Sequence, residues 1–337
     1  MTIPTPGCRV STNAEQGRPT GRRREEPAMH QSVREAFMPF SKPLEGRLDF
    51  MYLDVKGLVS TGVGNLLDAD DPSAFGSNPN PLPDIFTLDW FDKDTGVLAD
   101  RAEIEEEYRK VKFSGTSLAT TDQKGAVTRL RTSQQAIDAL VTRKLDSFEN
   151  SLRGRDMFAG YDGWPADGQL GLLSMAWAMG PLFRFPKFQA AAASGDWLTM
   201  AQECRMTEAG NPGIIPRNVR NGLLFTLAGW VTTLPDGDHG RLVFDPVRRL
   251  DDWMRSGDHP VPLNLTIGLQ KALETLGFDP KGLDGIIGKG TRAALTAFQA
   301  SLALTQTPGV SSVTDVPQET MVALRAGLDA RGVACFP

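Results

Sequence analysis

Residues 45–67, EGRLDFMYLDVKGLVSTGVGNLL, place Glu45, Asp54 and Ser60 around one short hairpin pattern, with Gly62 and Gly64 after the hydroxyl. Glu45 comes first, Asp54 follows nine positions later, and Ser60 follows six positions after that. The apolar run LDFMYL, the polar DVKG and the apolar LVSTGV predict a strand, a turn and a returning strand. Two carboxylates and a hydroxyl on such a hairpin are the groups that hydrolysis of a glycosidic bond requires.

The expected positions of these side chains follow from the hairpin. We expect Glu45 where a first helix gives way to the hairpin, and Asp54 at the edge of the turn. Ser60 lies on the returning strand, where its hydroxyl can hold a water molecule. Gly62 and Gly64 leave the backbone open to an approaching sugar. Two solvated surface acids fit the same spacing, so the spacing alone leaves both interpretations open.

Outside this segment the pattern is mostly helical. Apolar residues at helical spacing predict a helix over 132–153, and residues 168–180 are apolar nearly all round, which is typical of a buried central helix. Similar patterns predict further helices at 31–44, 100–112, 185–193, 196–206 and 216–230. We therefore expect an α+β fold that is mostly helical, with a small β-hairpin lobe.

Composition divides the chain into parts. Residues 1–30 are polar and rich in turn residues, which predicts a disordered tail. Residues 31–232 are expected to form a catalytic domain, in which 68–131 is an insertion. The insertion fits a wider substrate site, a partner-binding segment or a plain loop. Pro, Asp and Gly mark 233–262 as a linker with a short helix. A separate compact unit is expected to follow it over 263–330.

Overall composition excludes several classes of protein. The 337 residues carry a net charge of −5 and no basic stripe, which argues against nucleic acid as a partner. The longest apolar segment, 170–183, is too short for a membrane span. Residues 1–30 lack an apolar signal segment, so we expect synthesis in the cytoplasm. Three histidines and three cysteines are scattered without ligand spacing, so neither a metal nor a cofactor is expected.

The sequence of residues 45–65 resembles that of the phage-type lysozymes, which are muramidases. The resemblance implies that Glu45 is the general acid, and that Asp54 positions the attacking water with Ser60 in place of the family's threonine. It also implies inversion, with the two carboxyl groups roughly 6.5–9.5 Å apart, and a Glu45 kept partly protonated by a semi-apolar cleft. Asn65 stands where many members have histidine.

The resemblance continues downstream and covers roughly residues 35–230. The segment QLGLLSMAWAMG (169–180) is similar to the family's long central helix, and PRNVRNGLLF (216–225) is similar to its Arg-rich closing helix. Arg217 matches an arginine that pairs with the catalytic glutamate, and we assign it to substrate binding together with the two hairpin glycines. Arg220 is the alternative for that position. Pairing of either arginine with local acids alone also fits the sequence.

The segment DGIIGKGTRAALTAFQ (284–299) resembles the peptidoglycan-binding domain of three short helices, over about 263–328. Gly285 and Gly288 permit a tight loop, and Thr291 is predicted to cap the next helix. The matching positions are Leu269, Gln270, Leu273, Leu276, Gly277, Asp284, Gly285, Gly288, Thr291, Ala294, Phe298 and Gln299. A weak internal repeat of a loop and a helix runs through this part. A small bundle without a ligand fits the same residues.

Together the two resemblances predict a muramidase that hydrolyses the β-1,4 bond between N-acetylmuramic acid and N-acetylglucosamine in peptidoglycan strands. A non-catalytic wall-binding protein with a decayed lysozyme-like domain remains open, as does a lytic transglycosylase, which forms an anhydro product without water. Two settings fit: a phage endolysin, and an antibacterial effector injected by a secretion machine, with a secretion component or an immunity protein as a further partner. In both settings the enzyme acts in the periplasm or cell wall.

Overall fold

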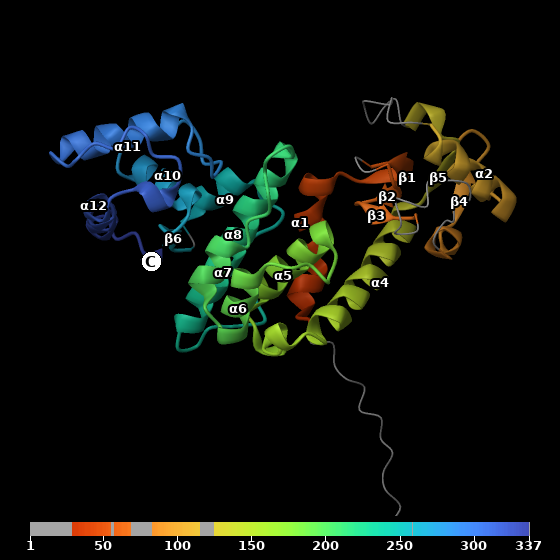
Figure 1. The fold of residues 1–337 in the computed structure, drawn as a ribbon, viewed down its shortest axis with the longest axis horizontal. Coiled ribbons are helices and arrows are strands. Elements are labelled where there is room, and N and C mark those ends of the chain that lie inside the picture. Colours follow the sequence, from red (N-terminus) through yellow and green to blue (C-terminus); the bar gives the residue numbers. More distant parts are fainter. Residues whose placement is uncertain (1–28, 55–56, 69–82, 115–124, 258, 337) are drawn as a thin grey trace, which may run out of the picture.

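The computed structural model describes residues 29–54, 57–68, 83–114, 125–257 and 259–336. The expected tail, except residues 29–30, and parts of the expected insertion lie outside these residues. The fold is α+β and mostly helical, as the sequence predicts, with two small sheets to one side of a helical body and a third in the C-terminal unit on the other side (Figure 1).

The helices are α1 (Gln31–Glu45), α2 (Arg101–Lys112), α4 (Gln134–Arg153), α5 (Ala166–Met179), α6 (Pro186–Ser194), α7 (Trp197–Glu203), α8 (Ile215–Thr233), α9 (Leu250–Ser256), α10 (Thr266–Thr275), α11 (Lys289–Ser301) and α12 (Gln318–Asp329). The strands are β1 (Leu48–Leu53), β2 (Val59–Gly62), β3 (Asn65–Leu66), β4 (Trp90–Asp92), β5 (Leu130–Thr132), β6 (Val261–Pro262) and β7 (Cys335–Phe336). Single 3-10 turns are η2 (Pro83–Thr87), η3 (Asp156–Phe158), η4 (Tyr161–Gly163), η5 (Pro212–Ile214) and η6 (Val313–Asp315).

Helix α5 is the centre of the helical body. Its residues from Ala166 to Trp177 are all buried, which the continuous apolar sequence predicts. Close packing depends on two glycines: a Cβ on Gly171 would lie 2.9 Å from the Phe225 ring of α8, and one on Gly168 would lie 2.8 Å from the Trp197 ring of α7. Helices α7 and α8 can therefore approach the backbone of α5 directly.

The hairpin forms a three-stranded antiparallel sheet in the order β1-β2-β3. Tyr52 lies opposite Ser60, and Leu53 lies opposite Val59. Because successive side chains of a strand point to opposite faces, the sheet has two different faces. Leu53 and Val59 belong to a hydrophobic core shared with the expected insertion, whereas Tyr52 and Ser60 lie on the other face.

The described part of the insertion is a small folded lobe, not a plain loop. We call residues 83–114 and 125–132 the inserted lobe. Its strands β4 and β5 pair antiparallel, with Trp90 opposite Thr132, and α2 lies between them in the chain. Trp90 and Tyr108 are fully buried in the core that the lobe shares with the sheet.

The C-terminal unit repeats one hydrogen-bond pattern. In the first copy, Gln270 of α10 donates to Thr291 of α11 (3.1 Å) and accepts from the Gly285 N–H (2.8 Å). In the second copy, Gln299 of α11 donates to Thr320 of α12 (3.1 Å) and accepts from the Thr307 N–H (2.9 Å). The internal repeat is therefore present in the structure as two glutamine latches, each holding a loop and the following helix.

Two local expectations for this unit differ from the structure. Thr291 is not a cap, because α11 starts after Gly288 and the Thr291 hydroxyl lies inside the helix, bonded to Gln270. The unit also extends beyond the expected bounds of 263–330. Strands β6 and β7 pair in parallel and bring Val261 beside Cys335 in its core.

Much of the expected linker, 233–262, packs on the helical body. Phe244 and Trp253 are buried in the main core, where their rings pack edge to face with centroids 5.2 Å apart. The buried carboxylate of Asp167 in α5 accepts the backbone N–H groups of Val243 and Phe244, both at 2.9 Å. Composition predicted a linker because Asp, Gly and Pro dominate, but these few aromatic residues and one buried acid fix the segment.

Candidate active site

Glu45 is the last residue of α1, where the helix meets the hairpin. Gly46 follows at φ +73, and its N–H closes the helix on the Lys42 carbonyl (3.0 Å). Positive φ is strained for residues with a side chain, so glycine allows the chain to leave the helix abruptly here. The Glu45 side chain is 26% exposed. The sequence predicted this position for Glu45, and the structure confirms it.

Arg217 of α8 forms an ion pair and a hydrogen bond with the Glu45 carboxylate. The same guanidinium donates to the Ser174 carbonyl (3.1 Å) and to the Ser174 hydroxyl (3.0 Å) of α5. Its side chain is only 3% exposed, so the cation is fixed by the helical body. The predicted pairing of Arg217 with Glu45 is confirmed. The alternative residue, Arg220, donates to the Pro216 carbonyl of its own helix (3.3 Å).

The environment of Glu45 favours its protonated form. Burial raises the pKa of the Glu45 carboxyl above its ordinary value, and the charges of Arg217 and Lys144 offset this only in part. The Lys144 ammonium of α4 lies 4.9 Å from the centre of the Trp177 ring. A carboxyl with a raised pKa keeps its proton to a higher pH than a solvated one, which suits it to deliver that proton to a substrate. The sequence pattern missed Lys144, because it lies far from the hairpin in the chain.

The hairpin backbone touches the Glu45 carboxylate at Gly64. This glycine has φ +77, and a Cβ there would lie 3.2 Å from Glu45 Oε2. The Trp177 indole of α5 donates to the neighbouring Val63 carbonyl (2.9 Å) and holds the hairpin against the helical body. Gly64 is therefore required by the approach of Glu45 itself. Its contact with a sugar stays a prediction.

Gly62 lies in a tighter place than expected. It has φ +62, and a Cβ there would lie 2.9 Å from Asn65 Oδ1 and 3.0 Å from Ile137 Cγ2. The space beside this glycine is thus filled by the protein, which accounts for the small residue without a ligand. A role of Gly62 in substrate binding also stays a prediction.

Asp54 sits at the edge of the turn, as predicted. Its carboxylate accepts the Leu58 N–H (2.9 Å), and its own N–H donates to the Leu58 carbonyl (2.9 Å). Alternation along β1 places Asp54 on the same face as Tyr52, and Ser60 lies opposite Tyr52 on β2. Ser60 is buried, at 3% exposure. Asp54 and Ser60 therefore lie on the same face of the sheet as Tyr52.

Tyr52 is affected by the charges of both candidate acids. Burial raises the pKa of the Tyr52 phenol, and the charges of Glu45 and of Asp54 raise it further. Charges act in this way only at short range in a protein. Tyr52 thus lies within range of both carboxylates, which come from different elements. The sequence analysis did not single out Tyr52, although it lies in the predicted strand two residues before Asp54.

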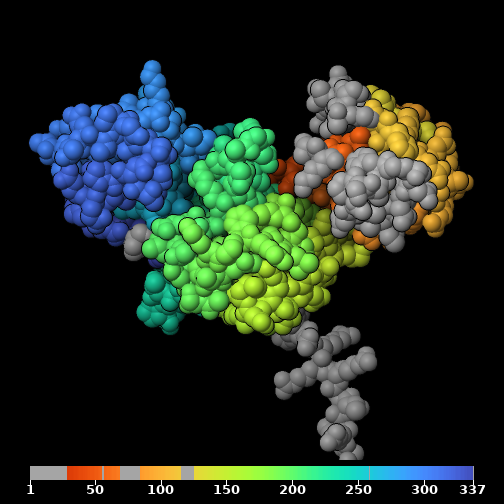
Figure 2. Space-filling view, viewed as in Figure 1, coloured from red at the N-terminus to blue at the C-terminus, as the bar shows by residue number. Residues whose placement is uncertain are grey.

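The end of α1 lies between two parts of the molecule. Figure 2 shows part of the red segment between the helical body, in green, and the inserted lobe, in orange and yellow. The candidate acid at the end of α1 therefore lies between two separate parts of the molecule. Such an arrangement is typical of sites for extended ligands.

Comparison with known families identifies the C-terminal part. Residues 266–311 match a family described as "Putative peptidoglycan binding domain". This range contains α10, α11 and the first glutamine latch. The chain thus carries a peptidoglycan-binding domain, and peptidoglycan is supported as its partner. A comparison with curated proteins found no match.

Two further features bear on the class of site. Within the described ranges, no group of three or more His, Cys, Asp or Glu side chains is arranged to hold a metal ion. Among the helices that the structure describes, none has both the length and the apolar character of a membrane span.

Proposed function

We propose that this protein is a muramidase that hydrolyses the glycan strands of peptidoglycan between N-acetylmuramic acid and N-acetylglucosamine. The observation that carries the proposal is the Glu45–Arg217 ion pair at the end of α1, next to a hairpin that carries Asp54 at its turn and Ser60 on its returning strand. The peptidoglycan-binding domain in the same chain supports this choice of substrate. The resemblance of residues 45–65 to the phage-type lysozymes supports the choice of reaction.

Glu45 acts as the general acid in this proposal. Its raised pKa keeps a proton available for the oxygen that leaves when the glycosidic bond breaks. Arg217 holds the carboxyl in place and stabilises the carboxylate that forms once the proton has moved. Ser174 and the buried surroundings of Arg217 prevent the guanidinium from following the substrate.

Asp54 acts as the base that directs water to the opposite face of the sugar. Its hydrogen bond from the Leu58 N–H fixes the orientation of the carboxylate at the turn. Ser60, on the same face, provides a hydroxyl that orients the water. A single displacement by water inverts the configuration at the anomeric carbon. The peptidoglycan-binding domain raises the local concentration of wall strands at the site.

The change Glu45→Gln tests the assignment directly. Glutamine keeps the size of the side chain but has no proton to give, so we expect loss of turbidity clearing and of sugar release from purified peptidoglycan, by about 100-fold or more. Glu35→Gln is the matched control, because Glu35 is an exposed acid on the same helix. Normal lysis by the Glu45→Gln protein would refute the proposal.

Two alternatives predict different results in the same assays. A non-catalytic wall-binding protein would sediment with insoluble peptidoglycan but would release no sugars. A lytic transglycosylase would release fragments that end in an anhydro sugar. The muramidase proposal requires released fragments with ordinary reducing ends.

The substrate lies outside the cytoplasm, so the proposal includes a route to it. We place the enzyme in the periplasm or cell wall, reached by release as a phage endolysin or by injection as an antibacterial effector. The neighbouring genes separate the two: a pore-forming holin indicates the first, and secretion components with an immunity protein indicate the second.

A further inference from the structure

The inserted lobe covers the back of the sheet that carries the candidate site. Met51 and Leu53 of β1, Val59 of β2 and Leu67 pack into one core with apolar residues of α2, β4 and β5. Tyr52, Asp54 and Ser60 lie on the opposite face. The short sheet would otherwise expose its apolar face, and small sheets need a packed apolar face or a covering helix to be stable. The lobe therefore supplies the solid support for the hairpin.

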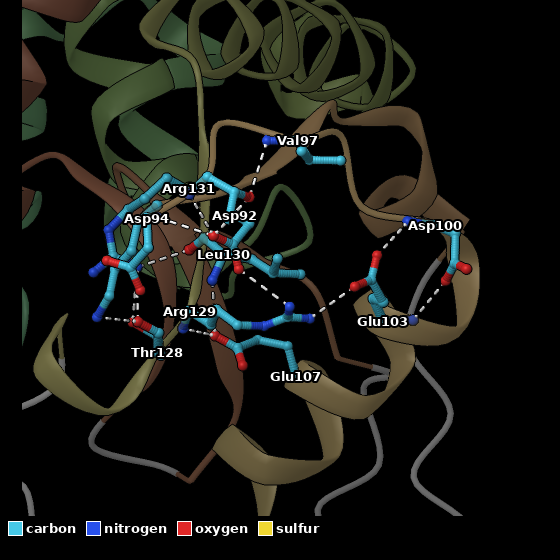
Figure 3. Close-up of polar contacts among 12 residues, drawn as sticks. Asp92, Asp94, Val97, Asp100, Glu103, Glu107, Thr128, Arg129, Leu130 and Arg131 are labelled. Carbon is cyan, nitrogen blue, oxygen red and sulfur yellow. Dashed lines mark hydrogen bonds and ion pairs between the residues drawn. The ribbon is translucent and has the colours of Figure 1, made fainter.

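Helix α2 is itself fixed by a polar network, shown in Figure 3. The Arg129 guanidinium lies between Asp92 (3.1 Å) and Glu103 (3.1 Å), so it joins β4 to α2. Glu107 of α2 accepts the backbone N–H groups of Arg129 and Leu130 at the start of β5, the second at 3.1 Å. These bonds anchor α2 on the strands of the lobe at several points along the helix.

The end of α2 reaches the hairpin through a buried ion pair. The Lys112 ammonium binds the Asp68 carboxylate, and the two side chains are 8% and 4% exposed. The Tyr108 hydroxyl donates to the same carboxylate. Asp68 in turn accepts the Val59 N–H (3.2 Å), and Lys112 also donates to the Gly57 carbonyl (3.4 Å).

These contacts lie on either side of Leu58, the residue that binds Asp54. Gly57 and Val59 are the chain neighbours of Leu58, whose N–H donates to the Asp54 carboxylate (2.9 Å). Ser60 follows one residue later. A change in the position of this segment therefore moves the candidate base and the candidate water-binding hydroxyl together, while Glu45 and Arg217 stay fixed to the helical body.

We infer that Lys112 and Asp68 are positioning residues, which hold the turn of the hairpin so that Asp54 and Ser60 face Glu45 at the separation that hydrolysis needs. This inference rests on the proposed function. It assigns a role to the insertion: the inserted lobe fixes the position of the hairpin segment that carries Asp54 and Ser60. Errors of about 1 Å in such positions reduce rates by about 100-fold, so support of this kind has a catalytic effect.

The change Lys112→Met tests the inference. Methionine keeps the apolar stem and removes the charge, so Asp68 loses its cation and Gly57 loses a donor. We expect kcat on soluble peptidoglycan fragments to fall by about tenfold with little change in KM, because Lys112 does not touch the substrate. Lys112→Arg should restore most of the activity. Lys110→Met is the matched control, because Lys110 is exposed on the same helix.

Amide hydrogen exchange provides a readout that needs no substrate. In the Lys112→Met protein, exchange at Leu58 and Val59 should become about tenfold faster, while exchange in α5 stays unchanged. Asp68→Asn, which keeps the acceptor for Tyr108, should give the same local effect if Lys112→Met folds poorly. Unchanged exchange at Leu58 and Val59, or equally faster exchange through the whole molecule, would overturn the inference. If the wild-type protein releases no sugars but the local exchange effect appears, the proposed function fails, while the role of Lys112 and Asp68 in holding the hairpin still stands.

Discussion

Arg217→Met is the change whose effect the structure predicts in most detail. Arg217 is buried, pairs with Glu45 and donates twice to Ser174. Removing one partner of a buried ion pair costs about 3–5 kcal/mol. The Glu45 side chain is 26% exposed, so solvent screens the remaining charge. We therefore expect a loss of about 2–3 kcal/mol at pH 8, or a fall in Tm of about 4–12 °C.

The loss should depend on pH, with a sign that follows from Glu45. Burial raises the pKa of Glu45 above 4.5, so its contribution to stability is complete below pH 4.5 and is lost as pH rises through the folded-state pKa. The variant lacks the charge and the hydrogen bond of Arg217, which lower this pKa. Its pKa rises further, and more stability is lost with rising pH. The gap between wild type and variant should be small at pH 4 and largest at pH 8.

Thermal unfolding at pH 4, 6 and 8 measures this gap. Arg220→Met is the control, because Arg220 lies on the same helix and binds only the Pro216 carbonyl in the described structure. We expect its effect on Tm to be the same at each pH. In the hydrolysis assay, the alkaline limb of the Arg217→Met pH profile should move to higher pH, since Glu45 keeps its proton longer. A gap in Tm that is equal at pH 4 and pH 8 would refute the reasoning.

Three further predictions follow from single contacts. Gly64→Ala places a methyl 3.2 Å from Glu45 Oε2, so we expect the free energy of unfolding to fall by about 1–2 kcal/mol and lysis to slow about tenfold. Gly96→Ala is the control: with φ +69 and no atom within 4 Å, it should lose stability but not activity. Gln270→Ala and Gln299→Ala each break one latch, so each should lower the stability of the C-terminal unit by about 2–4 kcal/mol. Each should also weaken sedimentation with peptidoglycan. Unchanged thermal unfolding in both variants would contradict this. Burial raises the pKa of Asp167 to about 6, so wild-type stability should fall as pH rises from 4 to 7 by about 2 kcal/mol more than that of Asp167→Asn. Parallel pH curves of unfolding for the two proteins would exclude this.

The sequence predicts the long elements well and the short ones poorly. Helical spacing gives 132–153 and the continuous apolar run gives 168–180, close to α4 and α5. The pair β4 and β5 was not predicted, because three-residue strands are too short to show a period and lie on either side of α2. Trp90 and Thr132 meet only after the chain folds, so their pairing leaves no local signal.

The candidate site was predicted in the same uneven way. Glu45, Asp54 and Ser60 are recognisable because they lie within one short stretch of chain, from the end of α1 to the returning strand of the hairpin. Arg217 required a resemblance to a family, since nothing near Glu45 in the sequence indicates a partner on α8. Lys112 and Asp68 were missed, because an isolated lysine and an isolated aspartate become informative only when burial joins them.

Mass spectrometry of the fragments released from purified peptidoglycan in ¹⁸O-labelled water tests the central claim most directly. If Glu45 gives a proton while Asp54 directs water, each new reducing end should carry one ¹⁸O atom, and Glu45→Gln and Asp54→Asn should both stop its appearance. Fragments with anhydro ends, unlabelled ends, or labelled ends that persist in the Glu45→Gln protein would contradict it.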